Sequence, residues 1–230
     1  MLGSALNSLV QRLDNAARQA GRPSPAVLAV SKRQPAAAVA ALAAAGQRAF
    51  GENYVQEATA KQAELAGDPS MDAIAWHLIG HLQSNKAAVA AAAFDWVQTV
   101  DRARLVPLLA QSRPAGRAPL NMLIQVNIDD EDGKHGCRPE VIDALADALA
   151  AAPRLVLRGL MAIPAPLPDL DRRRDAFRRM KVLFDALAKR HATVDTLSMG
   201  MSDDAELAIA EGATMVRVGT ALFGARPPKD

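Results

Sequence analysis

The segment Ala26-Val27-Leu28-Ala29-Val30-Ser31-Lys32 holds five apolar residues in a row and ends on a lone cation. Pro25 and Pro35 flank it, and it is too short for a typical helix. An unbroken apolar run of this length is typical of a strand that is buried on both faces, as in a parallel sheet. We therefore predict a central parallel strand that ends at Lys32.

A lysine at the end of a buried strand either reaches water or has a chemical role. Lysine loses its proton readily when it is desolvated, and a neutral amine forms a Schiff base with a carbonyl group. For this segment taken alone, solvation of the strand end by Lys32 is the simpler interpretation. Motifs elsewhere in the chain are needed to distinguish solvation of the strand end from a chemical role for Lys32.

The composition of the chain excludes several classes of protein. Its 230 residues are 50% hydrophobic and only 3% aromatic, and the net charge of +2 gives no reason to expect a nucleic-acid partner. The single cysteine, Cys137, excludes an intrachain disulfide and suits a reducing cytosol. No apolar stretch approaches the roughly 20 residues of a membrane span, and the N-terminus lacks a signal core. We expect one cytoplasmic domain over residues 1–230, without a membrane partner.

Strand-like and helix-like segments alternate along the whole chain. An amphipathic helix to about residue 21 opens it, and each later helix-like segment separates two strands. Strict alternation at this spacing predicts a (β/α)8 barrel with an extra N-terminal helix; a doubly wound open sheet is the alternative. The eight expected strands are 26–32, 49–53, 74–80, 96–100, 121–128, 155–163, 196–199 and 215–223.

The loops after the seventh and eighth strands of such a barrel often hold phosphate. Here these loops fall at 198–204 and 217–220. Ser202 is well placed as the N-cap of the next helix, whose N–H groups and dipole favour an anion. Gly219 permits close approach to the backbone, and Thr220 adds a hydroxyl donor. Simple capping by Ser202 and a bulge at Gly219 are the alternatives.

The charged residues within these loops add to the prediction of an anion site. Asp203 and Asp204 would repel phosphate, so we expect both to point outward. Arg217 lies in an apolar strand and by alternation shares a face with Met215 and Gly219. An inward guanidinium needs an acceptor, because an unpaired buried charge is costly.

A lysine, a phosphate cradle and a buried arginine together suit pyridoxal 5′-phosphate (PLP). Lys32 would take the aldehyde and Arg217 the pyridine nitrogen. An arginine donates to an unprotonated ring nitrogen, which weakens the ring as an electron sink. This pattern disfavours chemistry that needs a strongly stabilised carbanion.

In these motifs the chain resembles the pyridoxal phosphate homeostasis protein family, the YggS/PROSC type. The barrel of that family is similar to the N-terminal domain of bacterial alanine racemase. The resemblance runs in order through essentially the whole chain. The segments that carry it are 29–32, 50–57, 76–86, 126–128 with Lys134 and Gly136, 158–161, 197–204 and 216–220.

The resemblance implies a role for each candidate residue. Lys32 carries PLP as an internal aldimine, and Arg217 faces the ring nitrogen. Asn53 lies near the cofactor. The phosphate is held by Ser202, Gly219 and Thr220.

The resemblance also implies a protein that binds and delivers PLP without an established catalytic activity. Six residues follow Gly224, so we expect the racemase C-terminal domain, with its tyrosine base, to be missing; the one tyrosine, Tyr54, lies in another motif. A PLP-dependent amino-acid racemase or lyase is the alternative, and a Schiff-base aldolase with a phosphosugar in the cradle is a third. We expect a monomer or weak dimer, with apo-PLP enzymes as possible recipients.

The remaining motifs are interpreted as structural. In one strand His77 and His81 would lie about 13 Å apart, so we expect no shared metal ion. We expect His77 in the barrel interior or beside the cofactor, and His81 on the surface. The basic segment 169–190 is interpreted as a solvated helix face. Its expected i,i+4 pairs are Asp169–Arg173 and Asp175–Arg179. Lys134 is either a secondary cofactor contact or an ordinary loop lysine, and Cys137 is given no role.

Overall fold

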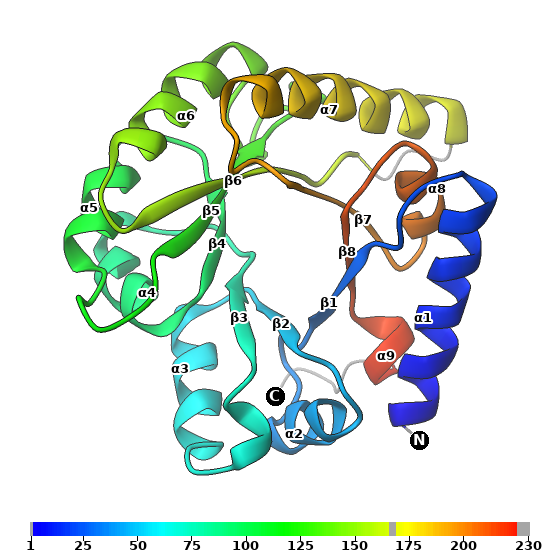
Figure 1. Cartoon of the computed structure of the whole chain (residues 1–230), viewed down its shortest axis with the longest axis vertical. Helices are drawn as coiled ribbons and strands as arrows, with labels where there is room; N and C mark the ends of the chain where they lie inside the picture. Colours follow the sequence, from blue (N-terminus) through cyan, green and yellow to red (C-terminus); the bar gives the residue numbers. More distant parts are fainter. Residues whose placement is uncertain (1, 166–168, 225–230) are drawn as a thin grey trace.

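Eight parallel strands pair in sequence order and close on themselves, because β8 pairs with β1 (Figure 1). The computed structural model describes residues 2–165 and 169–224. Closure confirms the predicted (β/α)8 barrel and excludes the open sheet. The strands are β1 (Ala26–Val30), β2 (Ala49–Glu52), β3 (Ala75–Leu78), β4 (Trp96–Val100), β5 (Leu120–Val126), β6 (Leu155–Ala162), β7 (Thr196–Met201) and β8 (Met215–Val218).

Helices surround the barrel and pack their apolar sides on its outer wall (Figure 1). Small and aliphatic side chains make most of this contact, as the low aromatic content predicts. Within the described residues, no helix has both the length and the apolar character to cross a membrane. The α-helices are α1 (Leu2–Gln19), α2 (Ala36–Ala44), α3 (Val55–Glu64), α4 (Ala87–Ala93), α5 (Leu105–Ser112), α6 (Ile142–Ala151), α7 (Leu170–Arg190), α8 (Ala205–Ala210) and α9 (Thr220–Phe223).

The expected extra N-terminal helix is α1, which lies against α2, α8 and α9 (Figure 1). Its buried residues follow helical spacing, which places one apolar stripe against the barrel. Since α9 has only four residues, α1 lies on the outside of this part of the barrel and packs on α8 and α9. The stripe consists of Leu6, Leu9, Leu13 and Ala17.

Strand β1 differs from its prediction in two ways. Only Leu28 and Ala29 are fully buried, whereas Ala26 is exposed and Val30 is half-buried. The strand ends at Val30, so the half-buried Lys32 lies in the following turn. The turn is tight enough to hold the next residue, Arg33, in the left-handed region at φ 63°.

Strand β8 was predicted to run to Phe223, and this was wrong. It ends at Val218, and the apolar residues after Gly219 form α9 instead. The amide groups of Leu222 and Phe223 both donate to the carbonyl of Gly219, which closes a helical turn. A short apolar run does not by itself distinguish a strand from a buried helical turn.

The basic helix α7 has the solvated face that its charges predicted, with one exception. Arg179 bonds Asp175 at 2.9 Å, as expected for an i,i+4 pair. The predicted pair between Asp169 and Arg173 was wrong, since the Asp169 carboxylate instead accepts from the amides of Asp171 and Arg172 and caps the helix. N-capping satisfies two otherwise unbonded donors and therefore stabilises the helix more than an exposed ion pair would.

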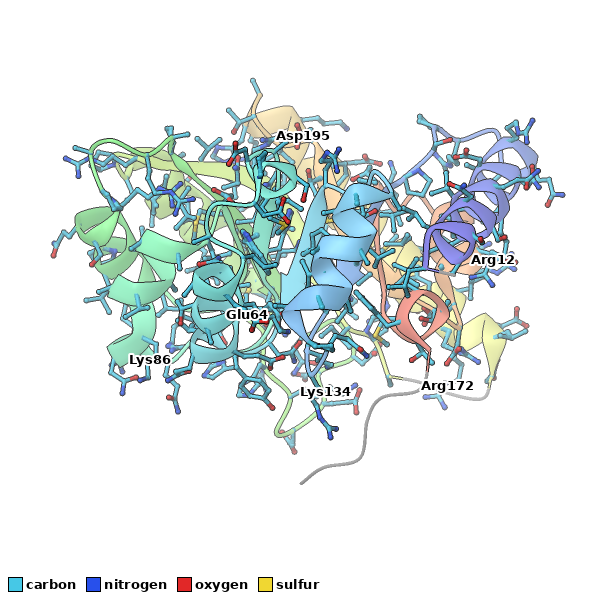
Figure 2. All side chains as sticks on the ribbon, turned by 90° about the horizontal axis from the view of Figure 1, so that it is seen from below. Arg12, Glu64, Lys86, Lys134, Arg172 and Asp195 are labelled. Atoms are coloured by element: carbon cyan, nitrogen blue, oxygen red, sulfur yellow. The ribbon has the colours of Figure 1, made fainter. Side chains whose placement is uncertain are left out.

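The two ends of the barrel carry different loops, which Figure 2 shows from the side. Lys134, Lys86 and Arg172, from loops and helix starts that follow strands, project at one end. Asp195, which directly precedes β7, lies at the opposite end. The first of these ends is where the carboxyl ends of all eight parallel strands meet, and it is the usual site of function in this fold.

Candidate functional site

The predicted site residues follow four strands that are neighbours in the barrel. In the pairing order β7-β8-β1-β2, Ser202 follows β7, Gly219 follows β8, and Asn53 follows β2. Lys32 lies two residues beyond the end of β1, between them. Because the strands are parallel, these residues lie along one side of the same barrel end.

Arg217 lies inside the barrel, as alternation along β8 predicted. The residue is only 4% exposed. Its Nη1 donates to Oγ of Ser198 at 2.9 Å, and its Nη2 donates to the carbonyl of Ala162 at 2.8 Å. These contacts supply the acceptors that an inward guanidinium requires. They fix the cation at the inner wall between β6, β7 and β8.

A buried chain of hydrogen bonds continues from this cation across the barrel. Oγ of Ser198 donates to Oε1 of Gln98 at 2.8 Å. Nε2 of Gln98 in turn lies 2.9 Å from Nδ1 of His77 and 3.3 Å from the sulfur of Met215. The chain connects four strands through their inward side chains. Arg217 is thereby held in one orientation, because its partner Ser198 is itself fixed by a hydrogen bond to Gln98.

The far end of this chain is an uncharged histidine. His77 is buried, as predicted, and its ring stacks on Trp96 with centroids 5.0 Å apart. Burial lowers the pKa of His77 to about 3, so the ring stays neutral and Nδ1 can accept from Gln98. Burial also lowers the pKa of Arg217 to about 10, against the opposing effect of the Asp204 carboxylate. Arg217 therefore remains a cation near neutral pH.

Sequence reasoning missed Gln98 and Ser198. Both are fully buried polar residues in strands whose neighbours are largely apolar. An isolated polar residue at an inward position of a barrel strand was the available signal.

Asn53 is held against the next loop by a close backbone approach. A Cβ atom on Gly80 would lie 2.0 Å from the carbonyl oxygen of Asn53, so only glycine allows this contact. The side-chain Oδ1 of Asn53 is buried, and within the described part of the chain it has no hydrogen-bond partner. The residue Asn53 borders a cavity of about 470 Å³ that Tyr54, His81 and Lys86 also line. An unpaired buried oxygen at a cavity is suited to a ligand donor or an ordered water.

Gly219 and Thr220 occupy the start of α9, next to the end of β1. A Cβ atom on Gly219 would come no closer than 3.4 Å to its neighbours, the nearest being the carbonyl oxygen of Val30. Packing therefore does not require glycine here, and its small size keeps the backbone approachable. The first N–H groups of a helix have no partners within it, and Thr220 is exposed beside them. These features fit an anionic group.

Ser202 was predicted to cap the helix after β7, and this was wrong. Strand β7 continues to Met201 through a register shift against β8, and the helix α8 begins only at Ala205. Ser202 thus lies in the intervening turn, where it lines a cavity of about 260 Å³ together with Arg12. Ser202 therefore lacks the helix-cap position on which the predicted phosphate contact depends.

The two aspartates of this loop behave differently. Asp203 is exposed, as expected. Asp204 was expected to point outward but is half-buried, and its Oδ1 accepts from the amide of Met201 at 2.6 Å. This contact closes the turn, and it brings a negative charge near enough to act on Arg217.

Three potential metal ligands meet at the rim, but their geometry does not converge on one ion. His81, which is exposed as predicted, stacks on His135 with centroids 3.7 Å apart and an angle of 13° between the rings. An ion at about 2.0 Å from a nitrogen of each ring would lie far out of at least one ring plane. The third group, Asp101, is already bonded to Arg102 at 2.5 Å.

Lys134 lies at the rim, in the loop after β5. Its ammonium group bonds the Glu131 carboxylate at 2.5 Å. The two side chains are 33% and 40% exposed, so the ion pair contributes little to stability.

The fold and the inward arginine define a barrel of the alanine racemase type. In agreement, a family model described as "Alanine racemase, N-terminal domain" matches residues 5–227. The chain is 53% identical over 217 residues to a "Pyridoxal phosphate homeostasis protein" of Pseudomonas aeruginosa, covering 94% of this chain and 91% of that protein. It is 50% identical to the protein of the same name from Escherichia coli K12, covering 94% and 92%.

A solved structure agrees with these relatives. PipY of Synechococcus elongatus, determined with PLP bound, is 39% identical and superimposes with a TM-score of 0.84, covering 97% of this chain and 100% of that one. The chain therefore belongs to the pyridoxal phosphate homeostasis protein family. The resemblance inferred from its motifs is confirmed.

Proposed function

We propose that this protein binds PLP at the carboxyl end of its barrel and serves in the intracellular homeostasis of that vitamin B6 cofactor, as a carrier or buffer. The observation that carries the proposal is the convergence of Lys32, Arg217 and Asn53 on neighbouring strands at one barrel end. The relatives named for PLP homeostasis and the PLP-bound PipY structure support it.

In this proposal each residue meets a different part of the cofactor. Lys32 binds the aldehyde carbon covalently as an aldimine, and Arg217 donates to the ring nitrogen. Gly219 and Thr220 receive the phosphate through backbone and hydroxyl donors. Asn53 contributes its unpaired Oδ1 at the cavity wall. Ser202 is kept as a phosphate contact from the turn that precedes α8, a position from which it would act through its hydroxyl alone.

The chemistry that PLP supplies when bound is reversible capture of an amine by its aldehyde. The amine of Lys32 would add to the aldehyde carbon with loss of one water, and hydrolysis would return the free cofactor and the amine. A linkage that hydrolyses without other change suits a protein that both holds and releases its ligand. Arg217, which remains a cation near neutral pH, favours an unprotonated ring nitrogen and so does not promote carbanion chemistry.

Spectroscopy of the purified protein tests the proposal. After incubation with PLP and removal of the unbound cofactor, we expect a visible band in the wild type, removal of that band by borohydride, and no band in Lys32→Ala. The matched control is Lys181→Ala, which removes a lysine from the outer helix α7. A wild-type protein that keeps no band after excess PLP has been added and then removed would refute the proposal, and a phosphosugar aldolase would then be tested with phosphorylated aldehydes.

A second assay separates a carrier from an enzyme. The loaded protein is mixed with an apo-PLP enzyme, and separately with candidate amino acids. A carrier restores activity to the apo-enzyme and leaves the amino acids unchanged. Steady formation of a racemised or cleaved product would instead assign the protein to the PLP-dependent racemases or lyases.

A further inference from the structure

A buried group of charges lies directly behind the Lys32 turn. The ammonium group of Lys61, on α3, has three oxygen acceptors: Oε1 of Glu52 at 2.6 Å, Oε1 of Glu57 at 2.7 Å, and the carbonyl of Ser31 at 2.7 Å. An ammonium group has three donors, so this set satisfies it fully. The Lys61 side chain is 8% exposed and that of Glu52 is 0% exposed.

These charges hold the chain on both sides of Lys32. Before it, Ser31 accepts from Lys61 through its carbonyl and donates through Oγ to Oε1 of Glu52 at 2.7 Å. After it, the amide of Arg33 donates to Oε1 of Glu57. The peptide groups that flank Lys32 are therefore both tied to the Lys61 cluster, which consists of Lys61, Glu52 and Glu57.

The Lys61 cluster contributes little net stability to the fold for the number of charges that it buries. Burying charges carries a desolvation penalty, and apolar residues of similar volume in their place are often neutral or stabilising. The second oxygen of Glu52 is buried without a hydrogen-bond partner among the described residues, and burial raises the pKa of its carboxyl group despite Lys61. Such a group is better explained by what it positions than by its contribution to stability.

The Lys32 turn, which the Lys61 cluster contacts, has a strained backbone. Arg33 is at φ 63°, a conformation that non-glycine residues rarely adopt. The bond from its amide to Glu57 lies at this strained point. Without this hydrogen bond the turn is less stable in its present conformation. A change in the turn would also change the direction of the Lys32 side chain.

We propose that Lys61 and Glu57 are positioning residues for the cofactor lysine: they fix the backbone on either side of Lys32 and so set the direction in which its amine enters the barrel mouth. This inference rests on the proposed binding of PLP to Lys32. Neither residue contacts the cofactor in this proposal, and both act through the Lys32 turn.

The test compares Glu57→Ala with Glu57→Gln, because glutamine keeps an oxygen acceptor for the Arg33 amide and alanine does not. PLP affinity is measured by titration, and visible circular dichroism reports how rigidly the bound cofactor is oriented. We expect Glu57→Ala to bind PLP at least tenfold more weakly and to lose most of the dichroic signal. Glu57→Gln should recover most of both, and both variants should melt cooperatively as apo-proteins.

Lys61→Met provides the second arm, with Lys181→Met on α7 as its matched control. We expect weaker binding and a reduced dichroic signal for Lys61→Met only, with borohydride still fixing PLP on Lys32 when the cofactor is in large excess. This variant leaves the buried Glu52 and the partly exposed Glu57 without their cation. If Lys61→Met does not fold, the two Glu57 variants decide.

Two results would overturn the inference, and they are distinguishable. Wild-type affinity and dichroism in Glu57→Ala would show that the Lys32 turn does not need this cluster. A wild-type protein that gives no cofactor band would overturn the proposed function itself, and this inference with it.

Discussion

Nη1 of Arg217 donates a 2.9 Å hydrogen bond to Oγ of Ser198, which joins the inward cation of β8 to the neighbouring strand β7. The same hydroxyl donates to Gln98, so one small side chain connects the guanidinium to the rest of the interior chain. The orientation of Arg217 is thus a property of the barrel interior.

Ser198→Ala should therefore destabilise the apo-protein. The variant leaves one guanidinium donor and one Gln98 acceptor without their partner in a fully buried setting. We expect a loss of about 1–3 kcal/mol in the free energy of unfolding, measured by urea denaturation. Ser112→Ala, at the end of α5, should change it by no more than about 0.5 kcal/mol. Equal stability of both variants would contradict the assigned network.

Asn53→Ala tests whether the unpaired Oδ1 faces the ligand. A neutral hydrogen bond contributes about 0.5–1.5 kcal/mol, so the dissociation constant for PLP should rise about twofold to tenfold. The exposed Asn7 on α1 provides the control, and Asn7→Ala should bind PLP like the wild type. Unchanged affinity in Asn53→Ala would place the oxygen outside the binding site.

The neutral His77 predicts a pH dependence of stability. Its pKa is about 3 in the folded protein against an ordinary value of 6.5, so between these two pH values the unfolded state holds one more proton. Stability is therefore fully present above about pH 6.5 and falls as the pH decreases, by at most about 1.4 kcal/mol per unit. His77→Asn should lack this contribution. Urea unfolding at several pH values checks the difference in slope, and identical slopes would contradict a buried neutral ring.

Cys137 should be unreactive in the folded protein. Burial raises the pKa of its thiol from an ordinary value of 9.0 to about 12. The thiolate fraction near pH 8 is then lower by about a thousandfold, and alkylation should slow accordingly. Timed reaction with iodoacetamide, with and without denaturant, measures this. Rapid labelling of the folded chain would mean that the thiol is open to solvent.

The barrel could be predicted from the sequence because its signals are local. Apolar runs such as 26–30, bounded by turn residues and separated by amphipathic segments, require only the periodicity of a strand or a helix. The inward direction of Arg217 followed from alternation in the same way. Lys32 stood out because it ends the first such run.

The errors arose where tertiary contacts decide. The register shift of β7 lengthens the strand and moves the helix start away from Ser202. The apolar residues 221–223 read as strand but close a helical turn on Gly219. Lys61 gave no signal at all, since in a polar helix its burial depends on β2 and on the turn after β1.

The most direct measurement is a peptide map of the protein after PLP loading and borohydride reduction. We predict that mass spectrometry finds one cofactor adduct, on the peptide that contains Lys32, and none in Lys32→Ala. An adduct located instead on another lysine, such as Lys61 or Lys134, or persistent labelling of Lys32→Ala at wild-type level, would contradict the assignment of Lys32 as the cofactor residue.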